Sequence, residues 1–161
     1  MSELSQAKRV RETALGVKVT KTAAVDNNTG IDLFTVTGEN LITLMYGIVT
    51  GVSDATVETI ALNEKASSVI IAAATTVTSD AVGEVYLVVG DGTVILNGTG
   101  NVPHLKTAYG LAASNHSHWI MDGQDGLIIE LTATDGGDAT LAIKWTILYV
   151  PLEVGSSIVA A

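Results

Sequence analysis

The alternation of apolar and polar residues along the chain predicts β-strands throughout and no long helix. The clearest stretch is 31–52, IDLFTVTGENLITLMYGIVTGV, whose β-branched and bulky residues suit a pleated, half-buried surface. We interpret it as two strands joined by a turn at Gly38, Glu39 and Asn40. The second strand carries apolar residues on both faces, which indicates a central strand covered on each side.

Shorter runs of the same kind predict further strands around this pair, separated by segments rich in Gly, Asp, Asn and Ser. A turn is expected at 122–126, and a hairpin is expected within 84–96 because Gly90, Asp91 and Gly92 suit a tight reversal. The other predicted strands cover residues 16–25, 56–62, 68–77, 117–121, 127–134 and 140–150. About nine closely spaced strands predict an all-β fold, an antiparallel, jelly-roll-like sandwich or barrel.

The length of 161 residues is that of one domain, and a chain of this size buries enough surface to fold without staples. We assign residues 16–153 to the β-sandwich or barrel. Residues 1–15 are polar and are expected to form an arm or a short helix. Residues 154–161 are small and uncharged, so they are expected to form a loose tail or to pack on a neighbouring molecule.

The charge of the chain is unevenly placed, and this distribution bears on its partners. The net charge is −9, yet residues 1–21 hold five basic and two acidic groups. The acidic remainder argues against nucleic acid as a partner, since phosphates would be repelled. The basic arm, with Lys8, Arg9 and Arg11, is expected to bind an acidic surface; the alternative is a solvated tail.

Some site classes and a membrane location are disfavoured by what the sequence lacks. There is no cysteine, which excludes disulfides and thiolate metal sites. The N-terminal residues do not resemble a signal peptide, and no apolar run is long enough to cross a bilayer, so we expect no membrane association.

Few residues suggest catalysis or metal binding. His116 and His118 are two positions apart, so on a strand both rings would share one face and could bind a metal together with His104 and Asp122. Ser114, His116 and Asp122 lack the strand–turn–helix context of a nucleophile elbow. Aspartates in two glycine-containing turns lack the EF-hand spacing for calcium; they are Asp122, Asp125, Asp135 and Asp138. We therefore expect no enzyme activity, metal or other cofactor, and we interpret the histidines as polar surface.

The aromatic residues allow two interpretations. Trp119, Trp145 and Tyr149 would form a stacking platform for a sugar or a base if they were exposed together. However, Trp145 and Tyr149 share one alternating face of their strand with aliphatic residues, which indicates the core or an oligomer interface. Aromatic residues make up only 4% of the chain, which disfavours an aromatic-lined ligand pocket.

The phrases DLFTVTG, LITLMYGIVTG and HWIMDGQDGLIIEL…IKWTILYVPLE, taken in order, give the chain a resemblance to the capsid decoration (cement) proteins of tailed bacteriophages. The resemblance covers roughly residues 16–153. It implies a homotrimer on the outer surface of the capsid, made in the host cytoplasm and located in the virion. The implied partner is the major capsid protein, which the terminal arm would grip, and the family has no catalytic residues to carry over.

The alternative is a carbohydrate- or receptor-binding β-module of a phage tail fibre or baseplate. Such a module needs an exposed aromatic platform with polar neighbours. Exposed Trp119 and Trp145 would favour it, whereas buried tryptophans and a stable trimer would favour decoration.

Overall fold

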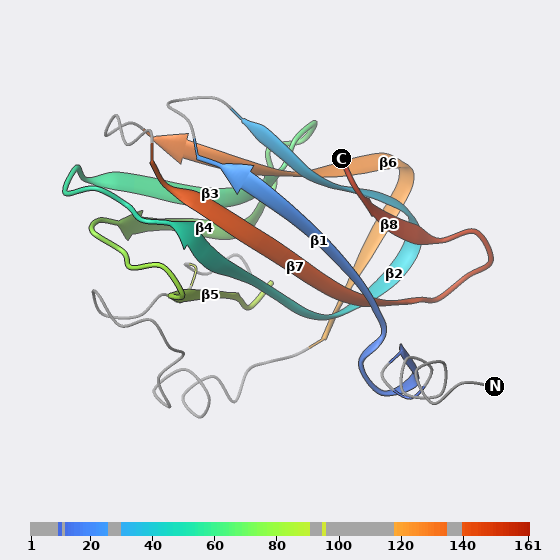
Figure 1. Cartoon of the computed structure of the whole chain (residues 1–161). Helices are drawn as coiled ribbons and strands as arrows, with labels where there is room; N and C mark the ends of the chain where they lie inside the picture. The colour runs from blue at the N-terminus through green and yellow to red at the C-terminus, as the bar shows by residue number, and fades with distance from the viewer. Residues whose placement is uncertain (1–9, 11, 26–29, 91–94, 96–117, 135–139) are drawn as a thin grey trace.

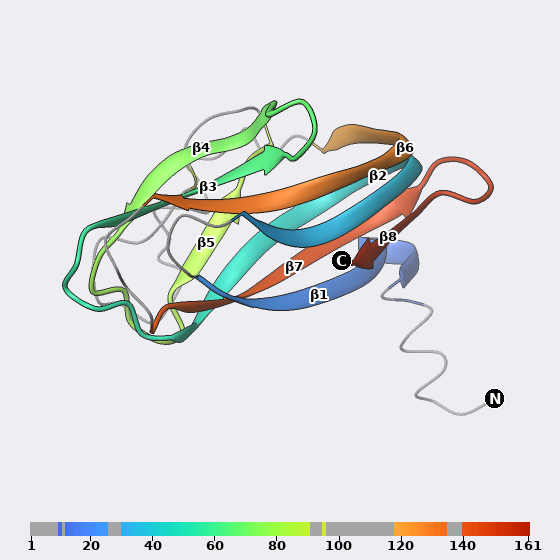
Figure 2. The same ribbon diagram turned by 90° about the horizontal axis from the view of Figure 1, so that it is seen from above.

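The chain forms a curled antiparallel β-sheet that folds over into two layers (Figures 1 and 2). The computed structural model describes residues 10, 12–25, 30–90, 95, 118–134 and 140–161. The strands of this part are β1 (Val17–Ala24), β2 (Ile31–Gly51), β3 (Glu58–Glu64), β4 (Ile70–Val77), β5 (Val85–Val88), β6 (Trp119–Thr134), β7 (Ala142–Pro151) and β8 (Ser157–Ala160). The predicted all-β class, an antiparallel sandwich or barrel, is confirmed.

The long strand β2 belongs to both layers. The strand order is β1-β7-β2-β6-β3-β4, and β5 and β8 also pair with β2. The N-terminal half of β2 pairs with β6 and β8, whereas its C-terminal half pairs with β7 and β5. One layer is therefore β1, β7, β5 and the second half of β2, and the other is β8, β6, β3, β4 and the first half of β2.

The predicted turn at 38–40 is wrong, because β2 runs through it without reversing. The predicted turn at 122–126 is wrong for the same reason, since β6 is also continuous there. Gly38 lies opposite Gly123, with a register shift between Val36 and Gly38, so the two glycine-containing segments form one bulge. Both strands keep a ladder of hydrogen bonds on each side of this point, and a bulge bends a strand without ending it.

The predicted loose C-terminal tail is also wrong, because residues 157–160 form β8. This strand pairs with residues 34–37 of β2, and Ile158 is buried. The backbone amide of Ala161 donates to the carbonyl of Leu33, and the Lys21 ammonium of β1 donates to the carbonyl of Ala161. The end of the chain thus ties β1 of one layer to β8 and β2 of the other.

Aliphatic side chains between the layers form the core, with few aromatic rings among them. The largest fully buried side chains include Trp145, Tyr86 and Phe34. Gly47 makes room for the Trp145 ring, since a Cβ there would lie 3.0 Å from that ring and 2.8 Å from Ile143. The Trp145 ring thus packs closely against the backbone of β2, as side chains do in protein interiors.

The described part of the predicted arm is helical. Residues 12–15 make a helical turn that ends at Gly16, whose φ of +87° is the left-handed conformation typical of a helix C-terminus. The amide of Gly16 donates to the carbonyl of Glu12 at 3.0 Å. Of the predicted hairpin, β5 is present and pairs with β2, whereas residues 91–94 lie outside the described part.

Candidate functional site

The outward side of the β1, β7, β2 and β5 layer carries an apolar hollow and two exposed lysines. Cross-strand pairing aligns its outward side chains in three rows. They are Lys18, Leu148 and Leu44 in the first; Thr20, Thr146, Tyr46 and Leu87 in the second; and Thr22, Lys144, Ile48 and Val85 in the third. We call this surface the outer face. Its apolar side chains gather mainly on β2 and β5, and its two lysines lie on β1 and β7.

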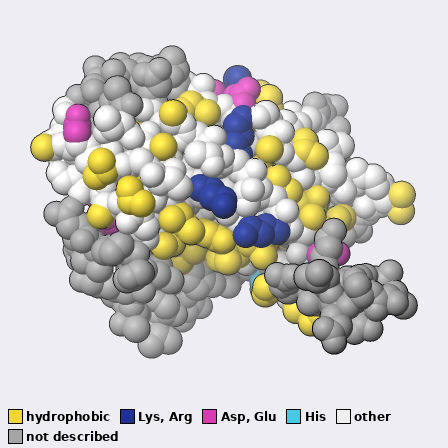
Figure 3. Space-filling view, in the orientation of Figure 1, with side chains coloured by type: hydrophobic (Ala, Val, Ile, Leu, Met, Phe, Trp, Pro, Cys, Tyr) yellow, Lys and Arg dark blue, Asp and Glu magenta, His cyan; other side chains and the backbone are white. Residues whose placement is uncertain are grey.

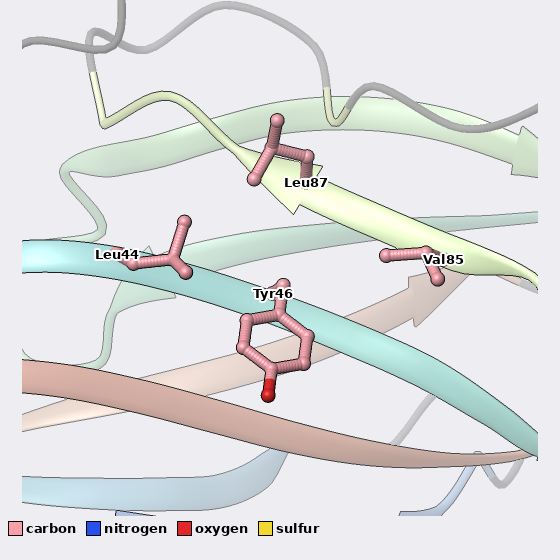
Figure 4. Close-up of a pocket in the computed structure, with 4 residues that line it drawn as sticks. All are labelled: Leu44, Tyr46, Val85 and Leu87. Carbon is pink, nitrogen blue, oxygen red and sulfur yellow. The ribbon is translucent and has the colours of Figure 1, made fainter. Parts of the chain in front are cut away.

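An apolar hollow of about 320 Å³ lies in the outer face (Figure 4). Leu44 and Tyr46 reach it from β2, and Val85 and Leu87 reach it from β5. Leu44 is 37% exposed, Tyr46 and Val85 are half-buried, and Leu87 is buried, with 6% of its surface exposed. Contiguous exposed apolar surface in soluble proteins commonly marks a place where a partner or ligand binds.

Exposed lysines accompany this apolar surface. Lys18 and Lys144 are exposed, and both belong to the rows of the outer face. Figure 3 shows lysine side chains over β1 and β7 beside a continuous apolar area, with the acidic side chains of this view toward its margins. In a chain of net charge −9, this gives the outer face a sign opposite to that of the rest of the protein.

A second exposed feature is the loop from Leu152 to Ser156 between β7 and β8, which projects from one end of the molecule (Figures 1 and 2). Val154 at its turn is fully exposed, and Leu152 is 45% exposed. The Leu152 amide donates to the carbonyl of Glu39 at 3.0 Å, and the Glu39 amide donates to Oε1 of Glu153 at 3.1 Å. The loop is therefore fixed to β2, although its apolar side chains point into solvent.

Two buried carboxyl groups lie where the connection between β4 and β5 meets the end of β2. Asp80 is 3% and Glu84 is 1% exposed. The Tyr86 hydroxyl donates to the Asp80 carboxylate, yet burial raises the pKa of Asp80. Burial also raises the pKa of Glu84, and the charge of Asp80 adds to this rise. The backbone amide of Ala81 lowers the pKa of Glu84 and so offsets part of this rise. The amide does not reach regular hydrogen-bond geometry, and neither carboxylate oxygen of Glu84 has a hydrogen-bond partner.

The aromatic residues singled out in the sequence do not share one exposed surface. Trp145 is fully buried and Tyr149 is 5% exposed, so both lie in the core. The Trp145 ring packs against Tyr86, with their centroids 6.5 Å apart. Trp119 on β6 is half-buried and lies against Gly90, where a Cβ would come within 2.4 Å of the indole.

The remaining predicted site residues are only partly placed. His118 is exposed just before β6, while His116, His104 and Ser114 lie outside the described residues. Within the described ranges, no group of three or more His, Asp or Glu residues is arranged to hold a metal ion. Lys8, Arg9 and Arg11 of the arm also lie outside the described part, so their role as a contact surface stays a prediction.

Sequence reasoning missed the outer face and the projecting loop. The alternation of Leu44, Tyr46 and Ile48 with Met45 and Gly47 is visible in the sequence, but apolar residues on both faces equally indicate a strand covered on both sides. Finding the hollow requires the register between β2 and β5, which the sequence does not reveal. For the loop, the signal was Val154 between Glu153 and Gly155, an apolar residue in a turn.

Comparisons of the chain with protein-family models, with curated proteins and with solved structures found no match. In the described part of the chain, no helix has the length and apolar character needed to span a membrane.

Proposed function

We propose that this chain is a structural binding protein that coats a larger assembly, in the manner of a phage capsid decoration protein. Its role is to stabilise the shell by covering it. Binding only to the assembled state favours that state by mass action, and no bond has to be made or broken. In this proposal the protein is made in the host cytoplasm and resides in the virion, with the major capsid protein as its partner.

The observation that carries this proposal is the pairing of a two-layered body with an apolar hollow in the outer face and an exposed apolar loop at Val154. Exposing such surface destabilises a free protein unless a partner covers it. The resemblance in sequence order and short phrases supports the same class of function.

The alternative of a carbohydrate-binding module gains no support from the aromatic residues. Trp145 is enclosed in the core, and Trp119 lies against the backbone of Gly90. Stacking on a sugar needs an accessible ring, which the Trp145 indole is not.

The test is co-sedimentation of the purified protein with DNA-filled heads of the phage that encodes it. We expect saturable binding at a fixed ratio to the major capsid protein, and heads that resist heat or loss of salt better when coated. Absence of co-sedimentation, or binding that never saturates, would overturn the proposal.

The basic arm is proposed to grip the shell. Residues 1–21 carry a charge of +3, opposite to that of the rest of the chain, and three of their five basic groups lie in the arm. Replacing Lys8, Arg9 and Arg11 together by Gln should weaken head binding about tenfold or more, because the attraction to an acidic surface is lost. Thermal unfolding should not change, since the strands begin at Val17.

A charge-preserving variant is the matched control for the arm. Lys8→Arg, Arg9→Lys and Arg11→Lys together should bind heads as the natural chain does. If the Gln variant binds equally well, the arm is not the contact, and the shell must be held by another surface.

A further inference from the structure

We propose that the loop between β7 and β8 of one copy docks into the hollow of the outer face of a second copy, so that copies of this chain join head to tail. The proposal concerns free protein in solution and therefore does not depend on capsid binding. It names the two surfaces through which an oligomer of this chain forms.

The loop has the properties of a preformed anchor. Val154 is 106% and Leu152 is 45% exposed, so both side chains are available to a partner. The loop is held by the bonds between Leu152, Glu39 and Glu153, and the Ser156 hydroxyl donates to the Glu153 carbonyl at 3.0 Å. A fixed loop loses little conformational entropy on binding, which favours affinity.

The hollow has the matching apolar character. Its lining combines three aliphatic side chains with the ring of Tyr46, and its volume of about 320 Å³ admits small aliphatic side chains such as those of the loop. Burying Val154 and Leu152 there removes apolar surface of both copies from water, which is the main driving force for association.

Charge complementarity selects this occupant over an arbitrary apolar partner. The loop carries the exposed carboxylates of Glu153 and of its neighbour Glu39. The outer face carries the exposed ammonium groups of Lys18 and Lys144. Opposite charges around an apolar contact guide the approach and set the orientation of the two copies.

The two surfaces cannot meet within one chain. The loop projects from the end of the molecule at which β7 passes into β8, whereas the hollow lies on the side of the sheet between β2 and β5 (Figures 1 and 4). A contact between two different patches is heterologous, and such contacts close into rings when the rotation between copies permits. A ring of three copies would match the homotrimer implied by the resemblance.

Engineered cysteines give the most direct test, because the natural chain has none. Val154→Cys protein and Leu44→Cys protein are purified reduced, mixed in equal amounts and oxidised mildly. We expect a disulfide between the two variants as the main product. The matched control is Val159→Cys with Leu44→Cys, since Val159 is an exposed valine only five residues further along, 52% exposed.

The outcomes separate the proposal from its rivals. A mixed disulfide several-fold more abundant with Val154→Cys than with Val159→Cys supports it. Equal yields, or Val154→Cys joining mainly to itself, overturn it. Failure of Leu44→Cys to react with either partner also overturns it, because the hollow would then be occupied by residues of its own chain.

Charge reversal adds a readout that a purely structural role would not give. Lys18→Glu with Lys144→Glu, and separately Glu39→Lys, should each weaken self-association several-fold in sedimentation velocity. Glu153 is kept because its carboxylate accepts from the Glu39 amide and so fixes the loop. Mixing the two variants should restore association between them, because each supplies the charge that the other now needs. If the mixture stays as weak as the separate variants, the two surfaces do not face each other.

Discussion

At the residue scale, the buried carboxyl pair Asp80 and Glu84 is the most unusual feature of the core. Charged groups are seldom enclosed without a partner, because removing them from water is costly. Here the Tyr86 hydroxyl satisfies only Asp80, and the Glu84 oxygens have no hydrogen-bond partner. The raised pKa of each group means that the folded protein retains protons that the unfolded chain has already released.

The pH dependence of stability follows from this difference. Between the ordinary carboxyl pKa of about 4 and the raised folded values, the native state binds more protons than the unfolded state. Stability should therefore fall as the pH rises through that window, and the loss is complete above the folded pKa values. Unfolding by urea at pH 5 and at pH 8 measures this, and the midpoint at pH 8 should be lower.

Glu84→Gln should remove part of this loss of stability at high pH, because a neutral amide costs less free energy to bury than a carboxylate. We expect a gain on the order of 1 kcal/mol at pH 8, or about 2–4 °C in Tm, and almost none at pH 4. The control is Glu39→Gln, which removes an exposed carboxylate. A variant that loses stability at pH 8, or gains the same at both pH values, would contradict the assigned cause.

At the scale of the element, the bulge shared by β2 and β6 determines how the sheet folds over. A Cβ at Gly123 would lie 2.2 Å from the backbone oxygen of Val36, so only glycine fits there. Gly38 and Gly126 have φ angles of +62° and +86°, which also favour glycine. These glycines therefore bend two paired strands at one place, and the bend lets β2 run through both layers.

Gly123→Ala should destabilise the protein strongly because rigid backbone, not a movable side chain, occupies the space that the methyl needs. We expect a loss of about 2–3 kcal/mol in urea unfolding. Gly126→Ala is the matched control in the same bulge, where only the backbone angle is unfavourable and nothing lies within 4 Å of the new Cβ. It should cost about 1 kcal/mol. Equal losses would show that the close approach to Val36 is not the cause.

The same bulge shows how far the sequence predicts the fold. Alternation such as that of Val17, Val19 and Lys18 identifies strands correctly, because one buried face leaves a period of two. A glycine beside a polar residue, as at Gly38 or Gly123, indicates an irregular backbone. It does not show whether the chain reverses or only bends, because that depends on pairing with strands that are distant in sequence. The hollow escapes prediction because it depends on pairing between β2 and β5, which lie far apart in sequence, whereas the loop has a local signal at Val154.

At the scale of the whole molecule, the C-terminal strand joins the two layers. β8 covers the edge of β2 beside Phe34, while Lys21 reaches from β1 to Ala161. Ile158 is the residue of β8 that enters the core, with 1% of its surface exposed. Residues that looked like a loose tail thus complete the body on which the two proposed contact surfaces are displayed.

Ile158→Ala should lower the free energy of unfolding by about 2–5 kcal/mol, because it leaves a cavity between the layers. The neighbouring Val159→Ala, which trims a side chain that is 52% exposed, should change it by less than about 1 kcal/mol. Thermal and urea unfolding of both variants measure the difference. Similar small losses in both would mean that β8 contributes little to the core.

The sharing of β2 between the layers has a mechanical consequence. Neither layer can unfold while the other stays intact, because both layers contain part of the same strand, β2. Unfolding under mechanical force should therefore occur in a single step, without a half-open intermediate whose unpaired strand edges could pair with other proteins. In the proposed role on a crowded shell, such all-or-nothing unfolding would leave few partly unfolded copies able to aggregate with their neighbours.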